Sequence, residues 1–284
     1  SQYPAVRDFW DDNKCYNARN ICTWHPDNFV FSNYHFVLFG IFCIITKKTE
    51  QTPVGRWKGA RLKTESAIVF VNPNSTQSMT DKIVMSANTA LNNRLKIRGV
   101  TCFGAPSAIQ GPNDAIKAKP ILFSNLKEAE NSNSELTVIA CFDDPFLLEA
   151  RETFSTPTIG IGWAAFTMCS LYSDRFGVIT TVPEALPVIK NNLKKYGLFD
   201  KCSFVHASNI PVLDFESKPE ETRVKMIEII HNLRKEYSIG SIALGCAGMA
   251  HLAKPFSKEF DMPIVDGVYA AALLGEGMLA IPNG

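Results

Sequence analysis

The sequence predicts an α/β protein with two similar lobes, each a mostly parallel sheet flanked by helices, and a cleft between the lobes. Short apolar segments typical of buried strands alternate with helical segments from Ser66 onward, which is the pattern of βαβ units. The alternation contains an approximate duplication, because Cys141 lies 69 residues after Asn72 and Cys246 lies 65 residues after Thr181. Each half therefore opens with a strand that ends in small polar residues and later presents a cysteine at the end of another strand.

The first half begins with residues 67–71, a short apolar run of the kind that forms a buried strand. The polar residues after it end the strand, and Asn74 or Ser75 can cap the helix that follows. Apolar residues recur every four positions and give this helix one buried face: Met79, Ile83, Ala87, Leu91 and Leu95.

The same alternation continues to the end of the chain. Further strands are predicted at 136–140, 176–180, 203–205, 241–245 and 263–265. Further helices are predicted at 146–154, 183–195, 220–237 and after Asp266. Cys141 follows the first of these strands directly, and Cys246 follows the fourth, so the two cysteines occupy matching positions.

One glycine motif invites a different interpretation. Residues 160–165 match GxGxxA, a pattern of dinucleotide-binding loops. The segment before it, 155–159, is a poor strand because Pro157 interrupts it. We therefore interpret the glycines as a close-packed entry to the helix that connects the two halves, and a nucleotide site is the less favoured alternative.

Composition excludes several classes of protein. The 284 residues include 29 Lys and Arg against 28 Asp and Glu, a net charge of +1, which argues against nucleic-acid binding and polybasic membrane contact. No apolar run reaches the roughly 18 residues that a membrane span needs, so we expect a cytoplasmic protein with no membrane association. The eight cysteines form no CxxC pair and no two histidines have metal-ligand spacing, so no metal site is expected.

Residues 1–65 differ from the rest of the chain. They contain an apolar segment at 36–45, which is too short for a membrane span. Acidic residues precede this segment and lysines follow it, contrary to the charge order of a secretory signal. We expect residues 1–65 to be an extension outside the catalytic fold, and both an ordered and a poorly ordered extension stay open.

The two matching cysteines are the candidate reactive groups. Ligands of parallel sheets bind beyond the carboxyl ends of the strands, where Cys141 and Cys246 lie. We expect a helix to start directly after each cysteine and to lower the pKa of its thiol. The pattern alone leaves three interpretations open: buried core residues, a dithiol acid/base site, or a nucleophilic cysteine with a histidine partner such as His206 or His251.

Four ordered motifs carry a family resemblance: Val-Asn-Pro-Asn-Ser-Thr at 71–76, Ile-Ala-Cys-Phe-Asp-Asp-Pro at 139–145, Leu-Gly-Cys-Ala-Gly-Met at 244–249 and Pro-Ile-Val-Asp-Gly-Val at 263–268. Together they resemble the hydantoin/allantoin racemase branch of the Asp/Glu racemase superfamily. The resemblance covers about three-quarters of the chain, from Ser66 onward. Glutamate and aspartate racemases typically have Cys-Asn-Thr and Gly-Cys-Thr-His around their cysteines, unlike this sequence.

The resemblance implies an isomerase that inverts C5 of allantoin or of a 5-monosubstituted hydantoin without metal, pyridoxal phosphate or nucleotide. Cys141 and Cys246 would be the two acid/base groups on opposite faces of the substrate carbon. Substrate contacts would come from the Asn74 and Thr181 side chains and from backbone N–H groups that stabilise an enolate-like oxygen: those of Phe142, Asp143, Ala247 and Gly248.

The resemblance also implies two lobes, residues 66–164 completed by 266–284 and residues 165–265, with the active site in the cleft between them. The same resemblance implies a small-molecule substrate, a homo-oligomer and a role in purine or nitrogen catabolism. Two alternatives stay open. One is an aspartate/glutamate-type racemase or a related isomerase or decarboxylase, and the other is a ligand-binding protein that keeps the fold without turnover.

Overall fold

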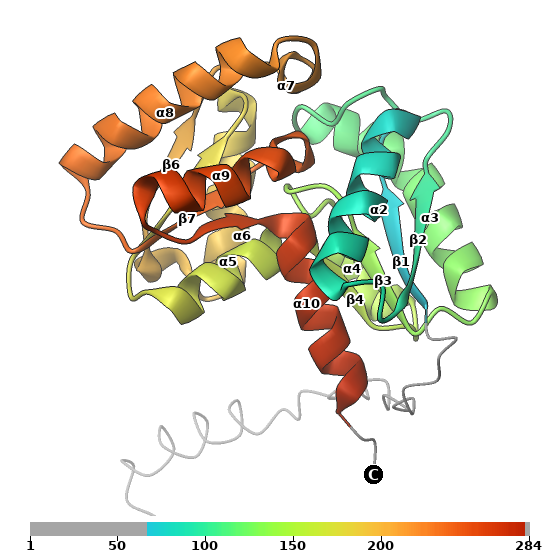
Figure 1. The fold of residues 1–284 in the computed structure, drawn as a ribbon. Helices are drawn as coiled ribbons and strands as arrows, with labels where there is room; N and C mark the ends of the chain where they lie inside the picture. The colour runs from blue at the N-terminus through green and yellow to red at the C-terminus, as the bar shows by residue number, and fades with distance from the viewer. Residues whose placement is uncertain (1–66, 282–284) are drawn as a thin grey trace, which may run out of the picture. The chain divides into compact units, whose positions relative to one another are not determined.

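The structure is a computed structural model that describes residues 67–281. The predictions for the N-terminal extension lie outside the described residues. The described chain contains two sheets, each of four parallel strands (Figure 1). The first sheet has the spatial order β2-β1-β3-β4, with β1 (Ala67–Asn72), β2 (Lys96–Thr101), β3 (Leu136–Ile139) and β4 (Thr158–Gly160). The second has the order β6-β5-β7-β8, with β5 (Phe176–Thr180), β6 (Cys202–Ala207), β7 (Ser241–Leu244) and β8 (Ile264–Asp266).

The helices and turns connect these strands along the chain. Those of the first half are α2 (Gln77–Leu91), α3 (Pro112–Asn131), α4 (Leu147–Thr153) and α5 (Ile161–Tyr172). Those of the second half are η1 (Pro183–Ala185), α6 (Leu186–Lys195), η2 (Phe199–Lys201), α7 (Asp214–Ser217), α8 (Pro219–Glu236), η3 (Ala247–Met249), α9 (Ala250–Phe260) and α10 (Gly267–Ala280). The two sheets thus have the same strand order, and the predicted α/β class with an internal duplication is confirmed.

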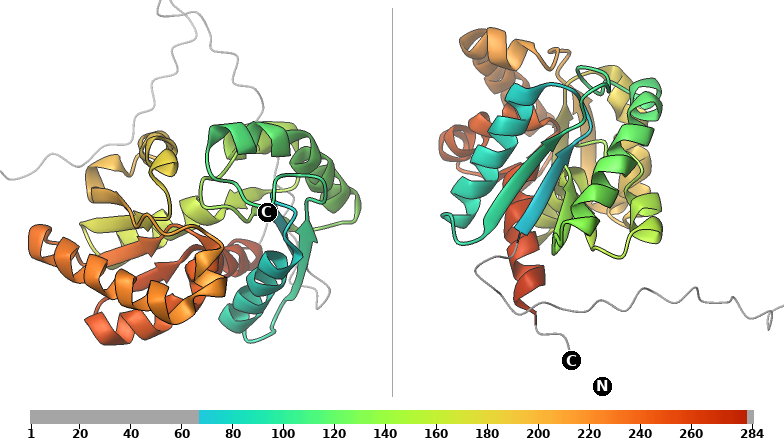
Figure 2. Two further views of the ribbon diagram at one scale, coloured as in Figure 1. Left: turned by 90° about the horizontal axis from the view of Figure 1, so that it is seen from above. Right: turned by 90° about the vertical axis from the view of Figure 1, so that its right-hand side faces the viewer.

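Alternating side chains of the central strands build separate cores on the two faces of each sheet. In β1, Ile68 and Phe70 belong to a central cluster that includes residues of both sheets, whereas Val69 and Val71 pack in a second cluster with α3 and α4. A third cluster covers the outer face of the second sheet under α8 and α9. The further views in Figure 2 show helices on both faces of each sheet.

The last helix, α10, joins the two halves. It packs against α2 and α5 and also contacts β3, β4 and β8 (Figure 1). Asp266 begins this helix, because its carboxylate accepts the backbone N–H groups of Val268 and Tyr269. The proposed lobe boundaries, 66–164 with 266–284 and 165–265, stay a prediction.

Several elements differ from the sequence prediction. Strand β2 and helix α3 had not been predicted, and β4 is a short strand despite Pro157 just before it. Phe146 has a left-handed backbone with φ 58°, so α4 begins only at Leu147 and Pro145 lies outside the helix. Among residues 67–281, no helix combines the length and apolar character of a membrane span.

Candidate active site

The carboxyl ends of β1, β3, β5 and β7 surround one cavity of about 50 Å³. The first half contributes six residues near the ends of its strands: Asn72, Asn74, Ala140, Cys141, Phe142 and Asp143. The second half contributes six from equivalent places: Thr180, Thr181, Val182, Gly245, Cys246 and Gly248. The two cysteines, each two residues beyond the end of its strand, therefore lie at a common cavity.

Cys141 lies on a loop that is held from two sides. Its carbonyl accepts the Asp144 N–H at 3.0 Å, and the Asp143 carbonyl accepts the side-chain amide of Asn192 from α6 at 2.7 Å. The backbone N–H of Asp143 donates to the Cys141 thiol. The ring of Phe142 is buried and packs edge-on against Phe166 in the central core, with ring centroids 5.2 Å apart.

Asp144 explains the glycine motif at residues 160–165. Its carboxylate accepts the N–H groups of Gly162 and Trp163 at 3.0 and 2.6 Å and the Tyr196 hydroxyl at 3.0 Å. A Cβ on Gly160 or Gly162 would collide with this carboxylate or with the Phe142 carbonyl. Because Gly160 and Gly162 lack side chains, the Cys141 loop packs closely against the start of α5. This confirms the interpretation of the glycine motif as a close-packed entry to the helix.

Cys246 lies on a loop held mainly by its own backbone. The Gly245 N–H donates to the Ile179 carbonyl at 2.7 Å, and the Met249 N–H donates to the Cys246 carbonyl at 3.0 Å. The Gly248 N–H lies 3.3 Å from the Cys246 thiol. The side chains that bond to this loop come from its own half: the Thr180 hydroxyl donates to the Gly245 carbonyl at 3.5 Å, and the His251 ring donates to the Gly248 carbonyl. The Cys141 loop differs, because Asn192 of α6 in the other half donates to it.

The expected helix N-terminus directly after the cysteine is wrong for Cys141, because helix α4 starts six residues later. It is confirmed for Cys246, because η3 begins at Ala247 and leads directly into α9. The expected net decrease in thiol pKa is wrong for both cysteines. Burial raises the pKa of Cys246 to about 11 and raises the pKa of Cys141 well above its usual value. The charge of Asp143 raises both pKa values further, while N–H donors from Asp143 and Gly248 lower them only in part. Both thiols are therefore mainly protonated near pH 7.

The two thiols also interact with each other, because the charge of Cys246 contributes to the raised pKa of Cys141. Coupled groups of this kind lose their protons one after the other. A state with one thiolate and one thiol is therefore favoured over a state with two thiolates.

The other predicted residues fall into three situations. The Asn74 amide oxygen accepts the N–H of Thr76 and the amide of Asn72, so only its NH2 group remains for a ligand, 3.4 Å from the Met79 sulfur. Thr181 is buried and lines the cavity. Ala247 lies in η3, and the role of its backbone N–H stays a prediction.

Sequence reasoning missed the residues that loops bring to the cavity. Ala108 and Ile109 come from the segment between β2 and α3, and Val212 comes from the segment between β6 and α7. No period or motif marks these positions. Asn72 could have been found, because it precedes Asn74 within the same motif and donates to Asn74 and Thr80 at 2.9 and 3.0 Å.

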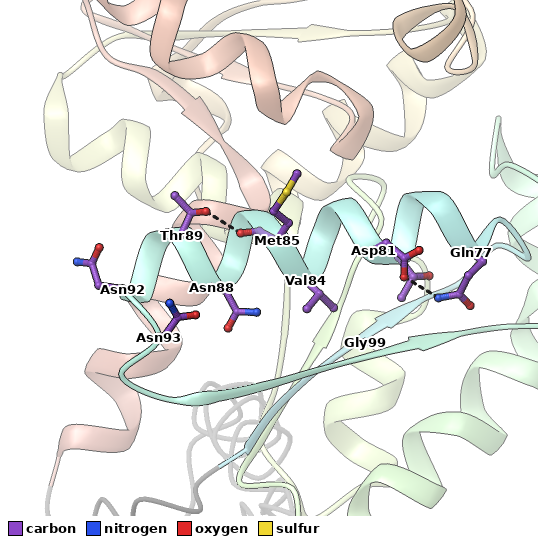
Figure 3. A pocket seen from close by; sticks show the side chains of 10 residues that line it. Gln77, Asp81, Val84, Met85, Asn88, Thr89, Asn92, Asn93 and Gly99 are labelled. Carbon is purple, nitrogen blue, oxygen red and sulfur yellow. Dashed lines mark hydrogen bonds between the residues drawn. The ribbon is translucent and has the colours of Figure 1, made fainter.

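A larger hollow of about 780 Å³ lies along α2 beside β2 (Figure 3). It is lined by Asp81, Met85, Asn88 and Asn92, and Gln77 at its end bonds Asp81. None of the cysteines is among its described lining residues, and it is open to solvent. The smaller cavity carries the reactive groups, so it is the candidate active site.

The fold and the paired thiols define a class of protein, and comparison with known proteins identifies it. The chain belongs to the Asp/Glu/Hydantoin racemase family, whose model matches residues 68–274. The curated hydantoin racemase of Rhizobium meliloti is 35% identical over 75% of this chain and 88% of that protein. The hydantoin racemase of Pseudomonas sp. (strain NS671) is 31% identical over 74% of this chain and 84% of its own.

Solved structures agree with this assignment. Allantoin racemase from Klebsiella pneumoniae has a TM-score of 0.72 and 31% identity, with 78% of this chain and 95% of that chain covered. Allantoin racemase from Pseudomonas fluorescens has a TM-score of 0.71 and 25% identity, with 77% and 97% covered. The protein is therefore an isomerase, a racemase of the hydantoin/allantoin racemase family, and the predicted resemblance is confirmed. The alternative of a ligand-binding protein without turnover is set aside.

Proposed function

We propose that the protein inverts C5 of allantoin or of a 5-monosubstituted hydantoin by proton transfer between Cys141 and Cys246. One observation carries the proposal: the two thiols line the same cavity from equivalent places in the two halves and are electrostatically coupled. One thiolate removes the C5 proton, and the opposite thiol donates a proton to the other face. The charge states of the two sulfurs are then exchanged, and the reverse reaction starts from that state.

The raised pKa values suit this chemistry. At pH 8, a thiol with a pKa of about 11 is ionised in roughly one molecule in a thousand. The rare thiolate is a strong base, as removal of a proton from carbon requires. Cys246 ionises more readily than Cys141, because the Gly248 and Met249 N–H groups donate to its sulfur. The Cys246 thiolate is therefore the first to form as the pH rises.

The charge of the cavity favours a neutral substrate. Its described lining residues include the carboxyl of Asp143 and no Lys, Arg or His. An aspartate or glutamate substrate would bring a carboxylate next to Asp143 without a cation to pair with it. A hydantoin is neutral and offers ring N–H donors and carbonyl acceptors. The amide of Asn74 and the hydroxyl of Thr181 are the proposed side-chain contacts to these groups.

The test uses single enantiomers of allantoin and of a panel of 5-substituted hydantoins in D2O. We expect loss of optical rotation together with entry of one deuterium at C5. Cys141→Ser and Cys246→Ser should each reduce racemisation by about 10²- to 10⁴-fold. Full racemisation by either variant would contradict the two-base mechanism, and racemisation of aspartate or glutamate in place of hydantoins would favour the amino-acid alternative.

A matched control is Cys202→Ser. Cys202 begins β6, is not among the cavity lining residues, and donates its thiol hydrogen to the Phe204 carbonyl at 3.1 Å, which serine can also do. This variant should racemise as the wild type does. A homo-oligomeric state and a cytoplasmic location stay predictions of the sequence.

A further inference from the structure

Two adjacent carboxyls follow Cys141, and their surroundings differ. Asp143 is 9% exposed and Asp144 is 4% exposed. Asp144 has three donors, from Gly162, Trp163 and Tyr196. The carboxyl of Asp143 forms no hydrogen bond or ion pair within residues 67–281, and only its main-chain atoms are bonded. A buried carboxylate without a partner costs free energy, and folded proteins rarely keep one without a reason.

The unpartnered carboxyl of Asp143 faces the candidate active site. It lines the cavity with both cysteines, and its charge acts on each thiol. A ring atom bonded to a carbon held between the two sulfurs can therefore come within reach of this carboxylate. In a hydantoin the ring atoms bonded to C5 are N1, which carries a hydrogen, and C4, which carries an oxygen. A carboxylate attracts the N–H and repels the oxygen, so N1 is the matching group.

We propose that the Asp143 carboxylate accepts a hydrogen bond from the ring N–H next to the reacting carbon, and that its charge excludes substrates with a carboxylate close to that carbon. The inference rests on the proposed function, because it takes a cyclic amide as substrate. It assigns to the Asp143 side chain a role separate from that of its backbone N–H, which donates to Cys141. Within residues 67–281 the Asp143 carboxyl has no donor, so a substrate N–H in the cavity would supply its hydrogen bond.

The first test combines Asp143→Asn with methylated substrates. For a 5-substituted hydantoin that the wild type racemises, Asp143→Asn should lower kcat/KM about 10- to 100-fold, mainly through KM. Methylation of N1 should lower kcat/KM of the wild type by a similar factor, and it should lower kcat/KM of Asp143→Asn only slightly. With the N3-methyl derivative, Asp143→Asn should still lower kcat/KM by the full 10- to 100-fold. Equal effects of Asp143→Asn on the N1-methyl and unmethylated substrates would overturn the proposed contact.

The second test measures the exclusion of charge. Hydantoin-5-acetic acid and hydantoin-5-acetamide are nearly equal in shape and differ by one negative charge. Wild type should prefer the amide, and Asp143→Asn should reduce that preference about 10-fold or more. Glu184→Gln is the matched control, because Glu184 lies between the cavity residues Val182 and Ala185 but is exposed to solvent. The control should keep the wild-type preference, and an equal decrease in both variants would overturn the exclusion.

The pH dependence separates a binding role from a purely structural one. Burial raises the pKa of Asp143 to about 7, so the carboxylate forms as the pH rises through that value. KM of the wild type should therefore fall between pH 6 and pH 8, and KM of Asp143→Asn should stay flat. The opposite trend would mean that a protonated Asp143 binds, and it would overturn the proposal.

The role of Asp143 and the racemisation itself can fail separately in these experiments. Deuterium entry at C5 that persists in Asp143→Asn, with unchanged KM and unchanged preference for the amide, would refute the role of Asp143 and leave the racemase chemistry intact. Absence of deuterium entry with every hydantoin in the wild type would refute the proposed function itself.

Discussion

The loops that carry Cys141 and Cys246 occupy equivalent places in two sheets of equal strand order, yet they are stabilised in different ways. The Cys141 loop is fixed by side chains from α6 and by the start of α5, through Asn192 and Asp144. The Cys246 loop is held by backbone bonds and by the nearby side chains of Thr180 and His251, and two of its N–H groups donate to the thiol. The difference teaches that a duplicated fold can place two identical side chains symmetrically and still give them unequal acidity.

The largest expected effect comes from crowding the first loop. Gly162→Ala places a Cβ against the Phe142 carbonyl and the Asp144 carboxylate, neither of which can move without breaking the loop. We expect a loss of about 1–3 kcal/mol in the free energy of unfolding and a comparable or larger loss of racemisation. Urea denaturation and polarimetry measure the two effects.

Gly248→Ala is the corresponding change in the second loop. Its Cβ would lie 3.5 Å from the Cys246 sulfur, an ordinary van der Waals contact. The free energy of unfolding should therefore change by less than about 1 kcal/mol. Equal destabilisation by Gly162→Ala and Gly248→Ala would contradict the contrast between the loops.

Effects of opposite sign on stability separate the two adjacent carboxyls. Burial raises the pKa of Asp144 to about 7, as it does that of Asp143, but only Asp144 has donors that offset this cost. Asp144→Asn should therefore destabilise the protein by about 1–3 kcal/mol, because an amide oxygen and an NH2 group cannot replace a carboxyl that accepts three donors. Asp143→Asn should stabilise it by about 1–4 kcal/mol at pH 8, because it removes a buried charge without a partner. Denaturant unfolding of both variants tests the opposite signs.

The pH dependence of that difference follows from the pKa of Asp143. Its pKa is raised from about 4 in the unfolded chain to about 7 in the folded protein, so the folded state binds the proton more tightly. This contribution to stability is complete below pH 4 and is lost as the pH rises to 7. The advantage of Asp143→Asn should therefore be small at pH 4 and should increase up to pH 7. An advantage that decreases with rising pH would contradict the burial of an unpaired carboxyl.

The smallest effect is the order in which the two thiols react. Alkylation by iodoacetamide at increasing pH, mapped by mass spectrometry, should modify Cys246 at a lower pH than Cys141. Cys169 serves as an internal control, because it is fully buried and its pKa is raised to about 12. Modification of Cys141 before Cys246 would contradict the proposal that the Cys246 thiolate forms first.

The elements that a sequence specifies locally were predicted well. Buried strands such as β1 and β7 are continuous apolar runs, and the polar residues or cysteines that end them mark the active-site edge of each sheet. β2 escaped prediction because it is an edge strand that contains Lys96, Arg98 and Gly99 and has no continuous apolar run. Helix α3 escaped because Pro120 interrupts its pattern.

The sequence by itself therefore determined the α/β class, the duplication, the family and the two cysteines at matching strand ends. Only the tertiary structure decided that burial raises the thiol pKa values, and that Asp144 is bonded while its neighbour Asp143 is not. Periodicity and capping act over a few residues, so a sequence displays them. Desolvation and hydrogen-bond partnership depend on which distant segments meet, and the partners of Asp144 lie 18 to 52 residues away.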